Sequence, residues 1–165
     1  MPESEQSNKL DTAVGIAVVL LATFLGICSV KAGNVGQKIA ARQAKVTSNW
    51  AWYQARNIRA DVYELAKDAE KHAAQQAKMA ELKEQTEVIE KEIEELNALD
   101  DQFDLCEAAL AVGLALFGVT ALLKRWAMFW AAAVPSALGV VIGVAGFCRV
   151  STDNPVTKAL LDVLG

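Results

Sequence analysis

The sequence AALAVGLALFGVTALLKRWAMFWAAAVPSALGVVIGVAGF, residues 108–147, decides the fold class of the chain. Its only charged residues, Lys124 and Arg125, separate uncharged segments of 16 and 22 residues. At about 1.5 Å of rise per residue, the longer segment makes a helix of roughly 33 Å, which matches a hydrocarbon core of ~30 Å. Because backbone groups in lipid must be hydrogen-bonded within the segment, we expect two helices joined by a tight turn in the membrane.

A further membrane span is expected near the N-terminus, where residues 12–30 form an uncharged run of 19 residues. This run is longer than the ~7–15 apolar residues of a signal peptide, and the segment before it is acidic, so we expect a retained span. The second span is extended back to Leu105, with Glu107 accepted at its interfacial end. The expected organisation is an N-terminal tail (1–11), transmembrane helices at 12–30, 105–123 and 126–147, an extramembrane segment (31–104) and a C-terminal tail (148–165) with a short amphipathic helix starting near Asp153-Asn154-Pro155.

Hydrophobic residues make up 53% of the chain and charged residues 22%, with a formal net charge of −4. The two populations are segregated along the sequence. Segregation excludes a soluble globular domain, in which apolar residues recur at helix or strand period. The high hydrophobicity excludes a disordered chain, and the acidic balance argues against a nucleic-acid partner. We therefore expect an all-α integral membrane protein that is surrounded by membrane lipid.

The charged segment 31–104 is expected to form a helical hairpin outside the membrane. It contains no proline, and no glycine after Gly36, and good helix formers dominate it. The first span leaves and the second span enters the same face of the bilayer, so the segment has to reverse. No large aliphatic or aromatic residue occurs between Leu65 and Met79, which places the tip at about 67–76. Thr47-Ser48-Asn49, with good N-cap residues, is a second candidate break.

The spacing of residues in both arms predicts an antiparallel coiled coil. In the return arm, positions three and four apart form one seam with two polar members: Met79, Leu82, Thr86, Ile89, Ile93, Leu96, Asp100 and Phe103. The outgoing arm offers Ile58, Val62 and Leu65, with Val35, Ile39, Val46 and Trp50 nearer the first span. Residues 31–60 carry six Lys or Arg and no acid, whereas residues 81–101 carry nine acids and two lysines. These charges favour antiparallel pairing, within one chain or between neighbouring chains.

The distribution of basic residues predicts the orientation in the membrane. The hairpin side carries the six Lys and Arg residues of segment 31–60, with Arg149 and Lys158 in the C-terminal tail. Lys9, Lys124 and Arg125 lie on the opposite side. The positive-inside rule therefore places the hairpin and the C-terminus in the cytoplasm and the N-terminus outside. The alternative is a periplasmic coiled coil anchored by the first span.

An aromatic and basic block runs from Trp50 to Arg59. Trp50, Trp52 and Tyr53 cannot share one helix face, so some must contact the other arm, another subunit or lipid headgroups. Packing between helices or subunits is one interpretation of the block. The other is a surface for an anionic lipid or ligand, with Arg56 and Arg59 as the phosphate contacts.

Small residues on two of the spans permit close approach of helices. Gly26 lies on a small-residue face of the first span, and Gly139 and Gly143 form a GxxxG pattern in the third. Because three spans make a thin bundle, we expect a homo-oligomer, with a cyclic assembly as the simplest closed form. The candidate oligomer or helix-packing contacts are Trp50, Trp52, Tyr53, Ile58, Val62, Leu65, Ile89, Ile93, Leu96, Gly26, Gly139 and Gly143.

The sequence resembles an uncharacterised family of small bacterial membrane proteins that is classed as a domain of unknown function. The resemblance rests on one N-terminal span, the block at Trp50–Arg59 and a two-span hairpin whose turn is Lys124-Arg125-Trp126. It covers roughly residues 10–148 and implies the bacterial cell (inner) membrane. The family implies no activity and no catalytic residues.

No motif in the chain predicts an enzyme, a cofactor or a metal site. Cys28, Cys106 and Cys148 are expected to be small apolar fillers near span ends, and His72 is expected to be solvated. We therefore expect a non-enzymatic, self-associating membrane protein with a structural or scaffolding role. The alternatives are a channel or pore formed by a homo-oligomeric ring, and a membrane adaptor that binds anionic lipid or a protein partner.

Overall fold

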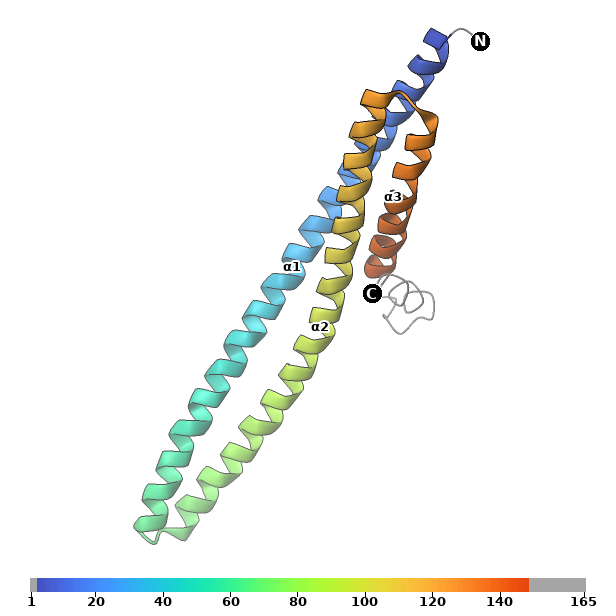
Figure 1. The fold of residues 1–165 in the computed structure, drawn as a ribbon. Helices are drawn as coiled ribbons and strands as arrows, with labels where there is room; N and C mark the ends of the chain where they lie inside the picture. The colour runs from blue at the N-terminus through green and yellow to red at the C-terminus, as the bar shows by residue number, and fades with distance from the viewer. Residues whose placement is uncertain (1–2, 149–165) are drawn as a thin grey trace. The chain divides into compact units, whose positions relative to one another are not determined.

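In the computed structural model the described part of the chain, residues 3–148, forms three α-helices: α1 (Glu3–Leu65), α2 (Ala69–Leu123) and α3 (Trp126–Phe147) (Figure 1). Each of them contains a stretch that is long and apolar enough to cross a membrane. No strand occurs among residues 3–148, so the expected all-α class is confirmed for them. Side chains are described from residue 7 onward, and the amphipathic helix expected after residue 148 lies outside the described residues.

The chain divides into two compact units. The apolar unit comprises the described residues up to Asn34 and those from Ala98 onward, and it contains the three apolar stretches. The hairpin unit comprises Val35–Asn97. In it, the end of α1 forms the outgoing arm (35–65) and the beginning of α2 forms the return arm (69–97).

The arms reverse at residues 66–68, without a glycine. Lys67 adopts a φ of 55°, in the left-handed region, and the Asp68 N–H donates to the carbonyl of Tyr63 at 2.9 Å. Asp68 then caps α2, since its Oδ1 accepts the backbone N–H of Lys71 at 3.2 Å. The Lys71 ammonium, 2.7 Å from Asp68 Oδ2, lowers the pKa of Asp68 below its ordinary value, and the Asp68 carboxylate raises the pKa of Lys71 above its ordinary value.

Helix α1 continues without interruption through Thr47-Ser48-Asn49, the alternative break. The Thr47 hydroxyl donates to the carbonyl of Gln43 at 3.0 Å, one turn earlier, and does not cap a new helix. The Asn49 side chain is buried in the hairpin unit, as described below. Neither Thr47 nor Asn49 therefore marks the start of a new helix.

In the apolar unit, α2 and α3 pack antiparallel with large residues facing small ones. A Cβ atom built on Gly139 would lie 2.8 Å from Leu110 Cγ, and one built on Gly146 would lie 3.1 Å from the Phe103 ring. The buried face of α3 contains Ile142 and five small residues that repeat at intervals of three and four: Ala132, Ser136, Gly139, Gly143 and Gly146. Side chains of α2 fill the space that these small residues leave, which allows the two helices to approach closely.

Helix α1 completes the apolar unit through two hydrophobic clusters. Near its N-terminal end, Leu10 and Val14 pack with Phe117 and Ala132. Further along, Cys28 packs with residues of α2 and α3, including Phe103 and Ile142. The Lys124 ammonium, in the turn between α2 and α3, pairs with the Asp11 carboxylate and closes this end of the unit.

Candidate interaction surfaces

The seam of the hairpin unit has a polar centre. Asn49 Nδ2 donates to Thr86 Oγ1 at 3.2 Å, and the Thr86 hydroxyl donates to the carbonyl of Leu82 at 2.7 Å. Both Asn49 and Thr86 are buried. An Asn within an apolar seam fixes the alignment of two helices, because any shift would leave its amide without a partner.

Two further contacts on either side of this centre fix the antiparallel register. Arg42 Nε donates to Glu92 Oε2 at 2.7 Å, and Arg56 Nη1 donates to Gln75 Oε1 at 3.1 Å. The buried Arg56 Nε has no hydrogen-bond partner. The expected charge attraction between the arms is therefore realised within one chain at one ion pair, that of Arg42 with Glu92.

The seam residues of the return arm lie where their spacing predicts. Met79, Thr86 and Ile93 are buried, and Leu82, Ile89 and Leu96 are half-buried. The outgoing arm differs from the expectation. Nine of its buried or half-buried positions again repeat at intervals of four and three: Val35, Ile39, Arg42, Val46, Asn49, Tyr53, Arg56, Ala60 and Tyr63.

The expected seam residues Ile58, Val62 and Leu65 lie instead on the outer face, with exposed fractions of 64%, 56% and 85%. The three- and four-residue spacing set by Val35, Ile39 and Val46 continues through polar or small residues. An apolar pattern therefore does not reveal this seam in the sequence. Asn49 takes the place expected for Trp50. The signal that could have found Asn49 is this spacing, because three and seven residues after Val46 come Asn49 and Tyr53.

A second stripe follows the outgoing arm on the face turned away from the seam, and we call it the outer stripe. Its members also repeat at intervals of three and four: Ala41, Ala44, Ser48, Ala51, Ala55, Ile58, Val62 and Leu65. All are exposed except Ala55, which is half-buried. The outgoing arm thus carries two faces that suit helix packing, and the hairpin uses one of them.

The aromatic block distributes its side chains over several faces. Tyr53 lies half-buried in the seam, and the Trp50 ring stands edge-on to it with 5.5 Å between the ring centroids. Trp52 is exposed, beside the outer stripe. Of the two candidate anionic-lipid contacts, Arg56 is half-buried and bound to Gln75, and Arg59 is exposed.

The small-residue faces of α3 and α1 have different environments. A Cβ built on Gly143 would lie 2.8 Å from Cys106 Sγ and 2.9 Å from the Phe24 ring, so this glycine lies inside the apolar unit. By contrast, a Cβ built on Gly15, Gly26 or Gly33 would meet nothing within 4 Å. The small face of α1 is therefore open, and that of α3 is occupied.

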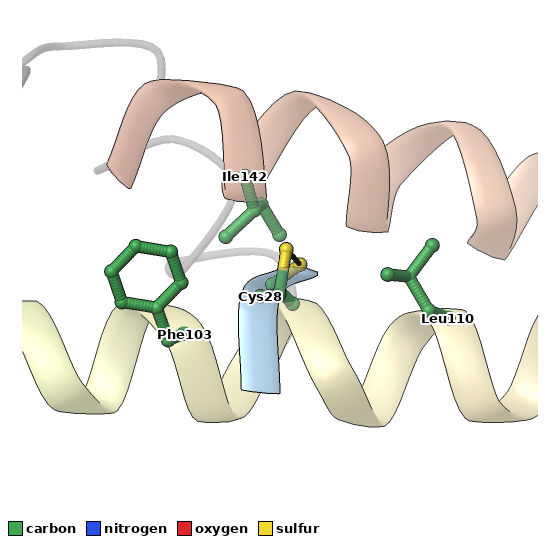
Figure 2. Packing of buried hydrophobic residues seen from close by; sticks show 5 residues of the cluster. Cys28, Phe103, Leu110 and Ile142 are labelled. Carbon is green, nitrogen blue, oxygen red and sulfur yellow. Dashed lines mark hydrogen bonds between the residues drawn. The ribbon is translucent and has the colours of Figure 1, made fainter. Parts of the chain in front are cut away.

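Figure 2 shows the centre of the apolar unit, where Cys28 lies among Phe103, Leu110 and Ile142. The Cys106 thiol donates to Cys28 Sγ across 3.6 Å, and neither residue is exposed. Cys148 is exposed. Within residues 3–148 no group of three His, Cys, Asp or Glu side chains is placed to hold a metal ion.

Acidic side chains cluster in the apolar unit just before the second apolar stretch. Burial, and then the neighbouring carboxylates of Asp104 and Asp101, raise the pKa of Asp100 above its ordinary value. Glu107 follows within the expected span, and its Oε1 is buried without a hydrogen-bond partner. Gln102 is buried beside this cluster and donates to the carbonyl of Ile142 at 3.2 Å.

The sequence matches the family model described as a domain of unknown function (DUF4337) over residues 10–80 and 66–149. The chain belongs to this family. The two matched segments of the DUF4337 chain overlap at the reversal between α1 and α2 and together contain all three apolar stretches. The expected resemblance to a family of unknown function is thereby confirmed. No curated protein and no solved structure matches the chain.

Proposed function

We propose that this DUF4337 protein is a non-enzymatic, self-associating membrane protein that acts as a structural scaffold. The observation that carries the proposal is the outer stripe of the hairpin unit. Ile58, Val62 and Leu65 face solvent there while the opposite face of the same helix is closed by the return arm. A helix that is covered on one face and carries an apolar stripe on the other is typical of a helix packed on both sides, and a contiguous exposed apolar patch marks an interaction site.

The proposed setting is the inner membrane of a bacterial cell. The three apolar stretches cross the bilayer, and the hairpin unit, an antiparallel coiled coil, projects into the cytoplasm with the C-terminus on the same side. Four basic residues within fifteen positions after the first stretch support this orientation: Lys31, Lys38, Arg42 and Lys45. The open small-residue face of α1 supports helix packing between copies inside the bilayer.

The oligomeric state in lipid tests the proposal. The full chain, fused to a fluorescent protein, would be placed in vesicles at a series of protein densities, and photobleaching steps would be counted for each fluorescent spot. We expect spots with several steps, and a matched vesicle preparation carrying a known monomeric membrane protein supplies the single-step reference. Single steps at every density would refute self-association.

The pore and adaptor alternatives have less support from the contacts. The hydroxyls of Thr23, Thr120 and Ser136 in the apolar stretches each donate to a backbone carbonyl one turn earlier, so they offer little polar lining. In the aromatic block, Arg56 is half-buried and bound to Gln75 in the seam, which leaves Arg59 as the exposed member of the two candidate lipid contacts. Ion flux across vesicles that contain the full chain would restore the pore interpretation.

A further inference from the structure

The outer face of the return arm differs in chemistry from the outer stripe. Near the reversal it is lined by exposed small residues: Ala73, Ala74, Ala77 and Ala80. Further along it carries exposed acids around Val88: Glu81, Glu84, Glu87, Glu94 and Glu95. The outer stripe has the opposite order, with large apolar residues near the reversal and alanines further along. The two outer faces of one hairpin are therefore complementary in size.

The outer faces are also complementary in charge. Residues 35–60 carry five Lys or Arg and no acid, and residues 81–95 carry seven acids and two lysines. Within the described hairpin unit, Arg42 with Glu92 is the only ion pair that joins the arms. Four exposed residues spaced seven apart follow the border of the outer stripe: Lys38, Lys45, Trp52 and Arg59. Three of the four are basic. A basic border favours an acidic partner surface.

We propose that the outer stripe of one chain binds the outer face of the return arm of a second copy. This inference rests on the proposed self-association and names the surfaces that carry it. The contact joins two different faces, so it is heterologous, and repeated around an axis it closes into a ring. The partner is therefore a second copy of this chain in the same orientation.

The register of the hairpin predicts which residues meet. In copies related by rotation about one axis, residues of equal number lie at equal levels. Asn49 faces Thr86 within a hairpin. Val62 follows Asn49 by thirteen residues, and Ala73 precedes Thr86 by thirteen, so these two residues lie at the same level.

The same counting aligns the other complementary groups. Ile58 lies level with Ala77, nine residues from the Asn49–Thr86 contact, which again sets a large side chain against a small one. Lys45 lies level with position 90, four residues from that contact and between Glu87 and Glu94 of that outer face. Apolar packing near the reversal and ion pairs further along thus occur in one register.

The alternative contact, outer stripe against outer stripe about a two-fold axis, is disfavoured by charge. It would bring the basic borders of two copies together, at Lys38, Lys45 and Arg59. Like charges in contact are unfavourable, whereas the heterologous contact sets Lys38 and Lys45 against the acidic part of the return arm. Cross-linking distinguishes the two arrangements because each predicts a different pair of nearby residues.

The test uses full-length chains with two different tags, co-expressed in membranes on a Cys148→Ser background that retains the buried Cys28 and Cys106. One chain carries Val62→Cys and the other Ala73→Cys, and a mild oxidant forms disulfides between close thiols. We expect a covalent dimer that contains both tags. Pairing Val62→Cys with Glu94→Cys, which lies far from that level, is the matched control and is expected to give none.

The outcomes separate this inference from the proposed function. A dimer formed by Val62→Cys chains alone would overturn the heterologous contact in favour of the two-fold one. Absence of the Val62–Ala73 dimer in chains that still bleach in several steps would overturn the named surfaces but not self-association. Single-step bleaching would overturn both. As a second readout, Lys45→Glu should weaken association about two- to fivefold.

Discussion

Replacing the polar centre of the hairpin seam tests whether Asn49 and Thr86 stabilise the fold or mainly select its register. Asn49 is 3% exposed and Thr86 is 1% exposed, so water does not compensate for a lost partner. In Asn49→Ala, Thr86 keeps its hydrogen bond to the carbonyl of Leu82 and loses the amide of Asn49. The loss of one neutral hydrogen bond, about 0.5–1.5 kcal/mol, and of buried side-chain volume predicts a destabilisation of about 1–2 kcal/mol.

The paired apolar replacement has a different expectation. Asn49→Leu with Thr86→Val removes both polar partners and leaves the seam apolar, so the free energy of opening should stay within about 1 kcal/mol of the original or rise. The single variant Asn49→Leu should be less stable than the pair, because Thr86 then faces an apolar side chain. The double-mutant cycle should give a coupling energy of about 0.5–1.5 kcal/mol.

Hydrogen exchange of the full chain in lipid nanodiscs measures these effects. Backbone amides of the two arms report local opening free energies, and amides of α3 in the same molecule serve as the internal control. An unchanged opening free energy in Asn49→Ala would refute the assigned hydrogen bond. A loss of more than about 2 kcal/mol in the paired variant would refute the view that the polar pair serves register rather than stability.

Three further predictions follow from the geometry. Lys67→Gly should raise the opening free energy of the hairpin by about 1 kcal/mol in the same exchange experiment, because a left-handed φ is costly for lysine and free for glycine; no gain would contradict the turn geometry. Gly143→Val should lower the thermal stability of the apolar unit by about 1–3 kcal/mol through contact with Cys106, whereas Gly26→Val should change it by less than about 0.5 kcal/mol; equal effects would contradict the packing. Asp100 has a raised pKa in the folded state, so the stability it contributes is present below its unfolded pKa and is lost as pH rises through the folded pKa. Asp100→Asn should therefore stabilise the chain at neutral pH and make its stability depend less on pH on the acid side. An unchanged dependence of stability on pH would refute the assignment.

The helical class and the return seam could be predicted from sequence because the responsible side chains are large, apolar and regularly spaced. Apolar residues at intervals of three and four from Met79 to Leu96, interrupted only at Thr86, have few alternative explanations. The outgoing arm could not be predicted in the same way. Its seam passes through Arg42, Asn49 and Arg56, which look solvent-facing, while its outer stripe contains Ile58, Val62 and Leu65 at seam-like spacing.

The small-residue faces show a second limit of prediction from one sequence. Gly26 and Gly139 each belong to small faces with spacings of three and four residues. Only Gly139 is covered within the chain, because the register of α2 against α3 brings Leu110 over it. That register depends on long-range packing, which the pattern of a single helix does not contain. The buried pair Cys28 and Cys106, 78 residues apart in sequence, could not be predicted for the same reason.

The outer stripe has only three large apolar side chains, and this number limits how strong the proposed assembly can be. Complete burial of Ile58, Val62 and Leu65 contributes about 1.5–3 kcal/mol for each side chain. Association of free molecules costs an estimated 4–15 kcal/mol, so the outer stripe alone gives at best weak binding in solution. In the proposed membrane setting, anchoring by the spans confines the copies to one plane and one orientation, which raises their effective concentration and lowers that cost. Self-association should therefore depend on the density of the protein in the bilayer, and the open small-residue face of α1 would add contacts that exist only there.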